Sequence, residues 1–461
     1  MTDLFNRLDK LTWSSWHTFT SFVLGTGWAM DAFETSIVSA NIAYISEDFN
    51  ITDPFQQSLI TSVWNAGGLV GALLFGYLGD RFGRKFTFVF SLIMYSAFTL
   101  ITSFSPSFLF FLILRACTAI GVAAEYSAVT SSVSEFLPMA NRGQVTALIQ
   151  GTWSIGAILA SAVNVLIIPM FSTHLGWRVA FSLGAVAALF ALWARKNIPE
   201  SPRWLVNRNQ LEKAESIVRQ IEIDAKQPDN NINVEQSPYL VHEHENLFSQ
   251  VAGLVFNHPF RTLFCSLLDA SQAFGGYGVS SFMSVCVFKL VDFPKDQIAL
   301  FYFVGNLFTI PGTLVTFFLI EKIDRKIMLP LGYSLAAVSA VLLAPAALSG
   351  NLTWVWVAYC FYQFGYTMAW NIGYPMYAEI FPTRYRATGI GFSVAVGRTA
   401  GFAAPLLLET VYSSGNGQNI LGATLLLAGL FLSAVVASIP WAIYGVEARG
   451  KSLEDLFDEK L

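Results

Sequence analysis

Two acidic residues, Asp31 and Glu34, lie inside a long apolar segment near the start of the chain. Ionisable groups within such segments are costly and usually functional. Because they are three residues apart, one face of a helix presents both side chains. Two carboxylates so close in a medium of low dielectric constant do not easily both stay charged, so one can carry a proton. The alternative is a structural pair balanced by a nearby cation or lying near the membrane interface.

Two arginines, Arg115 and Arg398, lie equally deep in other apolar segments. Arg115 can pair with an acid of the first segment and release it on protonation, and Glu125 further along is another titrating group or a substrate contact. An arginine that extends toward the membrane interface is the alternative for Arg115. Arg398 has no acid within one turn of its own segment, so its partner is expected on another helix or in a substrate. Its planar guanidinium suits a carboxylate, and the alternative is a salt bridge to an acid of the N-terminal half.

Polar and aromatic residues in the other apolar segments are candidates for contact with a small, partly flat solute. They are Tyr126, Gln150, Gln272, Tyr366, Trp370 and Asn371. Aromatic residues at helical spacing are also ordinary packing, which remains the alternative for each. The cysteines lack metal-ligand spacing, and no nucleotide loop or triad is visible. We therefore expect no cofactor, no bound metal and no enzymatic activity.

The segments that hold these residues are long and apolar. The chain of 461 residues is 54% hydrophobic and 13% charged, about half the charge usual in soluble proteins. A membrane-spanning helix needs about 20 mainly apolar residues, and barrel strands are shorter. The sequence therefore predicts an all-α membrane protein of about 12 transmembrane helices, at 18–45, 58–79, 86–105, 108–135, 144–170, 177–195, 263–289, 297–320, 328–349, 353–379, 387–411 and 420–445.

Lysine and arginine gather in alternate loops, after spans 2, 4, 6, 8 and 10 and in the tail. By the positive-inside rule this predicts an even number of spans with both termini in the cytoplasm, in a plasma (inner) membrane. The net charge of −4 gives no indication of a nucleic-acid-binding surface. The expected partners are a small-molecule substrate, protons and membrane lipid, with no nucleic acid, and we expect a monomer.

Two sequence segments recur in the two halves of the chain. Glu135 to Pro138 followed by Arg142 is similar to Glu379 to Pro382 followed by Arg386, and 80–85 is similar to 321–326. Such a repeat predicts two six-helix bundles related by a pseudo-twofold axis, with a binding site between them near mid-membrane. The predicted domains are an N-terminal bundle at 1–196, a cytoplasmic linker with short helices at 197–260, and a C-terminal bundle with a cytoplasmic tail at 261–461.

Four motifs, in order along the chain, resemble signatures of one family. Gly76-Tyr77-Leu78-Gly79-Asp80-Arg81-Phe82-Gly83-Arg84-Lys85 is similar to the signature between spans 2 and 3 of the major facilitator superfamily. Segments 199–205, 379–389 and 447–454 resemble signatures of its sugar-porter and metabolite:proton symporter branches. The resemblance implies a secondary transporter that works by alternating access.

The resemblance also implies roles for single residues. The stretch around Asp31 and Glu34 is similar to the Asp-Gly-Phe-Asp segment of aromatic-acid proton symporters. Arg115 resembles the span-4 arginine of proton-coupled members, and Arg398 resembles an arginine that organic-ion symporters link to anionic substrates. A carboxylate such as Asp80, just past a helix end, can meet a helix N-terminus. Gating of the cytoplasmic side, with a plain charge cluster as the alternative, is implied for Gly76, Asp80, Arg81, Gly83, Arg84, Glu135, Arg142, Glu379 and Arg386.

Three functions fit these features. The first is proton-coupled symport of a small organic anion, either an aromatic or heterocyclic carboxylate or an acidic sugar. The second is a sugar or polyol:proton symporter, but 271–277 keeps only part of the Gln-Gln-x-x-Gly-x-Asn segment typical of sugar porters. The third is a membrane sensor that binds solute without moving it, which the retained gating motifs disfavour. Arg398 favours the organic anion.

Overall fold

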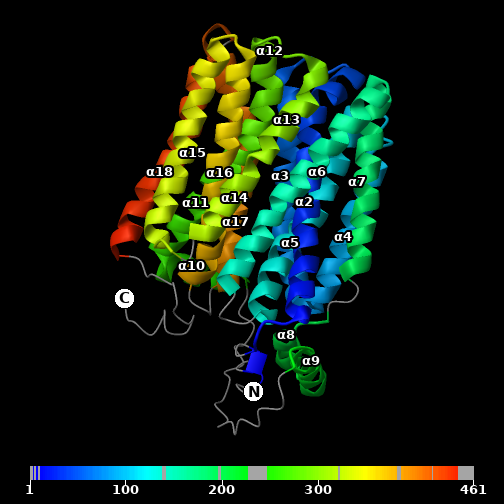
Figure 1. Cartoon of the computed structure of the whole chain (residues 1–461), viewed down its shortest axis with the longest axis vertical. Helices are drawn as coiled ribbons and strands as arrows, with labels where there is room; N and C mark the ends of the chain where they lie inside the picture. Colours follow the sequence, from blue (N-terminus) through cyan, green and yellow to red (C-terminus); the bar gives the residue numbers. More distant parts are fainter. Residues whose placement is uncertain are drawn as a thin grey trace.

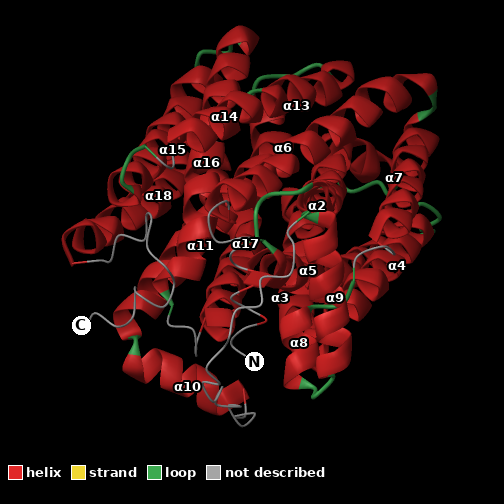
Figure 2. Ribbon diagram, turned by 60° about the horizontal axis from the view of Figure 1, so that its bottom comes forward, coloured by secondary structure: helices red, strands yellow, loops and turns green. Residues whose placement is uncertain are grey.

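A computed structural model describes residues 11–137, 142–195, 199–226, 247–319, 322–381, 386–417 and 419–444, together with Leu4, Arg7 and Leu8. Long helices run alongside one another over the length of the molecule, and the first long helix begins at the same end at which the last one, 420–444, finishes (Figure 1). This end, where the short helices α8 (Pro202–Asn207), α9 (Leu211–Asp224) and α10 (Leu247–Asn257) also lie, is called the linker end, and the other is the far end. Figure 2 turns the linker end forward and shows helices and connecting loops with no strand in the described ranges.

The first half of the chain forms six long helices. Gly83 breaks the chain between the second and third of them with a positive φ of 97°, and the Ser107 side chain caps the fourth by accepting a hydrogen bond from the Phe110 backbone. The helices are α2 (Ser15–Asp48), α3 (Pro54–Phe82), α4 (Arg84–Thr102), α5 (Phe108–Phe136), α6 (Arg142–Ile167) and α7 (Thr173–Arg195).

Short helices then connect the halves at the linker end: α8 (Pro202–Asn207), α9 (Leu211–Asp224) and α10 (Leu247–Asn257). The chain start is tied to this segment, since Arg7 forms ion pairs with Glu222 at 2.6 Å and Glu215 at 2.8 Å on α9. Residues 227–246 of the linker lie outside the described chain.

The second half repeats the pattern with two interruptions. One span continues from α11 through a π-helical turn, η3, and the next is divided at Phe308 into two consecutive helices. The elements are α11 (Pro259–Phe282), η3 (Met283–Val287), α12 (Phe288–Leu290), α13 (Ile298–Leu307), α14 (Thr309–Leu319), α15 (Arg325–Leu348), α16 (Leu352–Ile380), α17 (Arg386–Gly417) and α18 (Ile420–Tyr444).

Each of the twelve predicted spans coincides with one long helix or with consecutive helices, so the all-α prediction is confirmed. Within the described residues, seven segments meet length and hydropathy criteria for crossing a membrane: 84–102, 148–170, 259–290, 295–319, 326–348, 388–414 and 420–443. The 34-residue helix α2 is not among them, because polar residues such as Asp31, Glu34 and Asn41 lower its hydropathy. Its polar residues face inward, as the burial of these three shows.

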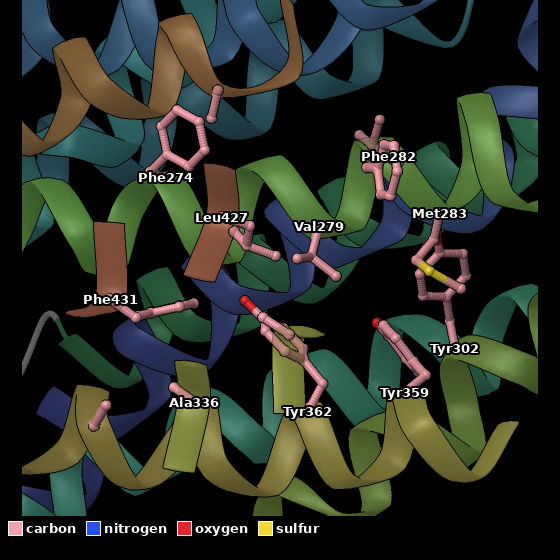
Figure 3. Close-up of a cluster of buried hydrophobic side chains, with 14 of the residues drawn as sticks. Phe274, Val279, Phe282, Met283, Tyr302, Ala336, Tyr359, Tyr362, Leu427 and Phe431 are labelled. Atoms are coloured by element: carbon pink, nitrogen blue, oxygen red, sulfur yellow. The ribbon is translucent and has the colours of Figure 1, made fainter. Parts of the chain in front are cut away.

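The surface and the interior reverse the pattern of a soluble protein. Large apolar side chains such as Phe22, Phe104 and Leu263 are more than half exposed, while His17, Asn65 and Gln272 are buried. Exposed apolar side chains and buried polar ones are what a lipid environment favours. The C-terminal half still has an apolar core, in which Tyr362 of α16 lies beside Phe431, and Tyr359 lies beside Tyr302 (Figure 3).

The two halves contact one another directly near the far end. The Tyr44 hydroxyl donates to the Lys295 carbonyl at 3.0 Å, and Lys295 also forms an ion pair with Glu47. Ser284 of the π-helical turn donates to the Ser39 carbonyl at 2.9 Å. These contacts hold α2 against the second half at the far end.

Candidate functional site

A central cavity of about 90 Å³ lies between the two halves. Helices α2 and α6 of the first half and α11, α13, α14 and α16 of the second supply its wall. The wall includes Thr35, Ser36, Ser39, Trp153, Tyr277, Ser280, Tyr302, Asn306, Gln363, Tyr366 and Trp370. A site built from both halves can change its access when one half tilts against the other.

Aromatic rings form two facing parts of this wall. Trp153 of α6 and Trp370 of α16 have ring centroids 5.9 Å apart at an angle of 34°. Tyr366 lies one turn from Trp370, also at 5.9 Å, and Trp28 approaches Trp153 at 6.2 Å. At these separations the rings interact with one another as aromatic pairs.

Amides and hydroxyls supply the polar part of the cavity. Asn306 donates to Ser161 at 2.8 Å and accepts from Gln363 at 2.9 Å, so these side chains are held in defined positions. The Tyr302 hydroxyl donates to the Ser280 carbonyl at 2.8 Å and pairs with Ser284 at 2.6 Å. Ser280, Tyr302, Asn306 and Gln363 line the cavity, and Ser284 joins this group to Ser39 of α2.

The first half contains a buried ion pair next to the cavity. The Arg115 guanidinium contacts Glu34 Oε2 at 3.3 Å and donates to the Glu34 backbone carbonyl at 3.1 Å. It also lies over the Trp64 ring at 4.2 Å from the centroid, a cation–π contact. Asp31 is buried one turn before Glu34. Arg115 is therefore a buried residue of the bundle interior and not an arginine at the membrane interface.

Close packing of α3 on α5 makes this arrangement possible. A Cβ on Gly67 would lie 2.3 Å from the Ala116 carbonyl oxygen, so only glycine allows the approach. The approach brings Trp64, three residues earlier on α3, over Arg115, the residue before Ala116.

Arg398 is buried in α17 and extends across the boundary between the halves. It donates to the Tyr277 hydroxyl, and its side chain lies on Gly68 of α3, where a Cβ would be 3.3 Å from Arg398 Cδ. Tyr277 lines the cavity but Arg398 does not, so the arginine lies directly behind the wall. The electrostatic attraction of a buried acid of the same half, Asp269 on α11, reaches Arg398. The sequence interpretation overlooked Asp269.

The structure divides the other predicted contact residues. Tyr366 and Trp370 line the cavity. Gln272 bonds the Ala369 carbonyl at 3.2 Å and Asn371 bonds Thr313 at 3.0 Å, so both connect helices outside the wall. Gln150 is buried and also lies outside the wall. Contact of these three with a solute stays a prediction, and the side chains of Glu125 and Tyr126 lie outside the described set.

The sequence analysis missed several wall residues, above all Trp153, Ser36, Ser39, Tyr277 and Asn306. Trp153 lies near the middle of a predicted span, where a tryptophan is far from either interface, and this position was the available signal. Asp269 carried the same signal as Asp31, an acid inside an apolar span.

At the linker end the structure joins two of the sequence motifs. Glu200 Oε1 accepts hydrogen bonds from the backbone of Arg84 at 2.8 Å and Ser201 at 2.9 Å, and Oε2 accepts from Lys85 at 3.2 Å. Glu200 thus caps the N-terminus of α4. Burial raises the pKa of its carboxyl, while the backbone N–H groups act in the opposite direction.

Gly83 fits this contact closely, since a Cβ there would lie 2.2 Å from Glu200 Oε2. Arg208, after α8, donates to the Arg81 carbonyl at 2.9 Å. Motif 447–454 lies outside the described residues. The side chains of the remaining gating candidates are also not described: Gly76, Asp80, Glu135, Arg142, Glu379 and Arg386.

Known proteins resemble this chain over nearly its whole length. The family model described as "Sugar (and other) transporter" matches residues 16–456. The chain is 29% identical to the niacin transporter NiaP of Acinetobacter baylyi, covering 98% of this chain and 99% of that protein. It is also 29% identical to a putative niacin/nicotinamide transporter of Bacillus subtilis, covering 94% and 96%. A partially occluded, inward-open structure of the xylose transporter XylE from E. coli matches with a TM-score of 0.73 at 18% identity, covering 94% and 99%, which shows the shared fold.

Proposed function

Because the chain belongs to the sugar (and other) transporter family of the major facilitator superfamily, we propose that it is a proton-coupled symporter of a small aromatic or heterocyclic carboxylate. The observation that carries this proposal is the cavity between the halves, where tryptophans from both halves lie beside a tyrosine that is bonded to a buried arginine. Nicotinate, a flat pyridine ring with one carboxylate, is the simplest solute of this class. The names of the two bacterial relatives support the same class.

The cavity offers different partners to the two parts of such a solute. The faces of Trp153 and Trp370 suit the planar ring. The Tyr277 hydroxyl accepts a hydrogen bond from Arg398, which polarises it as a donor to a carboxylate in the cavity. A bidentate contact with Arg398 itself then needs only a movement of the Tyr277 side chain. Binding between α6, α11 and α16 connects the two halves through the solute.

Proton coupling is assigned to the acids of α2 and to Arg115. When Glu34 is ionised, it neutralises the buried guanidinium. When Glu34 takes up a proton, the attraction weakens and α2 can move relative to α5. Since Thr35 and Ser36 of α2 line the cavity, this movement changes the binding site. Asp31, one turn away, is the alternative carrier.

The proposed setting follows the sequence interpretation. The protein is a monomer that spans the plasma (inner) membrane many times, with the linker end and both termini in the cytoplasm. Segments 1–196 and 261–461 are the two moving bundles and 197–260 connects them. The far end faces outward, and Tyr44, Glu47 and Lys295 join the two halves there.

An acidic sugar is the second candidate substrate. The hydroxyls of Ser36, Ser39 and Ser280 on the cavity wall favour it, because they match a solute with several hydroxyl groups.

Reconstitution into proteoliposomes tests the proposal. An inward proton gradient should drive accumulation of nicotinate, and a protonophore should abolish it. Nicotinamide is the matched control, since it keeps the ring but has no charge, and it should neither accumulate nor compete. Accumulation of nicotinamide or xylose without nicotinate would show that the proposed substrate class is wrong.

Two sets of variants separate coupling from binding. Asp31→Asn with Glu34→Gln should abolish uphill uptake but preserve exchange, and undiminished uphill uptake would refute the coupling. Arg398→Ala should lose nicotinate binding, and an unchanged affinity would refute the anion site.

A further inference from the structure

A second buried acid lies outside the ion pair of the first half. Asp269 of α11 is 5% exposed. Its Oδ2 atom packs so closely on α17 that a Cβ on Gly397 would lie 1.7 Å away. Its Oδ1 atom accepts no hydrogen bond from any residue that the structure describes. The residue after Gly397 is Arg398, so the glycine allows the carboxylate to approach the helix that carries the buried cation.

Five elements around Asp269 determine its electrostatic environment. Arg398 on α17 attracts it, and the Tyr377 hydroxyl of α16, which donates to Gln272 Oε1 at 3.4 Å, also faces it. The other titratable groups that face it are neutral at physiological pH: Tyr366 on α16, Tyr333 on α15 and Cys265 on α11 itself. Helix α18, which also packs on α11, has Tyr444 at its end as its one titratable residue. Arg398 is thus the cation among the groups that face this carboxylate.

This group of residues lies behind the cavity wall but contacts it. Tyr277 lines the cavity and bonds Arg398, and Tyr366 lines the cavity and donates to the Gln272 carbonyl at 3.2 Å, three residues from Asp269. The ion pair of Glu34 with Arg115 lies in the other half and shares none of these residues. A change of charge at Asp269 would therefore act on the binding site separately from that pair.

We propose that Asp269 is a second proton-binding site, whose negative charge balances that of Arg398 until a substrate carboxylate takes over this role. With Asp269 ionised, Arg398 is already neutralised and a second carboxylate meets repulsion. One proton from solution adds to the Asp269 carboxylate, the guanidinium keeps its charge, and the incoming substrate carboxylate restores neutrality. The buried guanidinium of Arg398 therefore needs one anion beside it at any time, because an uncompensated buried charge is strongly destabilising. The inference rests on the proposed role of Arg398 as the anion site.

Binding of nicotinate to the purified full-length protein, measured by calorimetry from mildly acidic to mildly alkaline buffer, tests the inference. In the wild-type protein the affinity should fall as the pH rises, because ionised Asp269 competes with the ligand. Asp269→Asn should bind about tenfold more tightly in alkaline buffer, a coupling of usual size, and should lose most of the pH dependence. Asp53→Asn, which neutralises an exposed acid, is the matched control and should behave like the wild type.

The outcomes separate this inference from the proposed function. If Arg398→Gln abolishes binding while Asp269→Asn keeps wild-type affinity and pH dependence, Asp269 has no such role and the proposed function stands. If Arg398→Gln binds nicotinate normally, the anion site itself is wrong.

Thermal unfolding without ligand tests the interaction of Asp269 with Arg398 even if a variant is less stable. Each single neutralisation should lower the melting temperature, because it leaves the opposite charge buried. The double variant Asp269→Asn with Arg398→Gln should melt above both single variants. Additive losses would show that the two charges do not interact and would overturn the inference.

Discussion

Replacement of Glu34 by glutamine tests the buried ion pair most directly. The amide keeps the shape of the side chain but loses the charge that faces Arg115 at 3.3 Å. Removal of one partner of a buried pair costs about 3–5 kcal/mol. The contacts of Arg115 with the Glu34 carbonyl at 3.1 Å and the Trp64 ring at 4.2 Å remain. We therefore expect a loss at the lower end of that range, about 3 kcal/mol.

The assay is thermal unfolding of the purified protein, combined with transport in proteoliposomes. The loss corresponds to a fall of roughly 3 °C in melting temperature for a chain of this size. Uphill, proton-driven uptake should disappear, because residue 34 no longer changes charge, while exchange across the membrane should persist. Asp31→Asn, at the neighbouring buried acid, is the matched control and shows whether one carboxylate or both carry the proton.

Two results would refute this reasoning. An unchanged melting temperature would mean that Glu34 does not neutralise Arg115 in the resting protein. Unimpaired uphill uptake would mean that the transported proton binds elsewhere. A further loss of stability when Arg115→Gln is added would also contradict a direct pair, since the doubly neutral protein should recover part of the loss.

Three other predictions follow from the linker end and the cavity. Gly83→Ala should lower the stability by more than about 1 kcal/mol, because φ is 97° and the new Cβ would lie 2.2 Å from Glu200. Gly391→Ala is the control and should not lower the stability, because a Cβ there meets nothing within 4 Å. Thermal unfolding compares the two variants. Because burial raises the pKa of Glu200, its contribution to stability is fully present below the ordinary glutamate pKa and is lost as the pH rises through the folded-state pKa. Glu200→Gln should flatten this part of the curve of melting temperature against pH, and an unchanged curve would contradict it. Trp370→Ala should weaken nicotinate binding about tenfold through loss of ring stacking, whereas Trp354→Ala on the exposed face of the same helix should leave calorimetric affinity unchanged.

The helices were predictable because lipid imposes a simple requirement on sequence, namely enough consecutive apolar residues to cross it. The neighbourhood of Arg115 was predictable for a related reason, since a cation inside such a span needs an anion nearby. The stripe that faces the cavity was also visible in part, because Gln363, Tyr366 and Trp370 recur at helical spacing on α16.

The rotation and pairing of the helices were not predictable from the sequence. Asn371 directly follows Trp370 yet bonds Thr313 of α14, because adjacent residues on a helix point about 100° apart. Asp269 and Arg398 are far apart in the chain, and only the packing of α11 on α17 brings them together. Which buried polar group faces solute and which faces another helix depends on this packing, which hydropathy does not specify.

The glycines under Arg398 have a mechanical consequence. When two helices pack through large side chains, these side chains interdigitate and resist displacement of one helix along the other. Where α3 meets α17, Gly68 lies under Arg398 and Gly401 faces Asn65. Each helix therefore presents a glycine to a polar side chain of the other. Helices α3 and α17 can therefore move against one another with little steric resistance when the halves turn, and the charge of Arg398 moves with the C-terminal half.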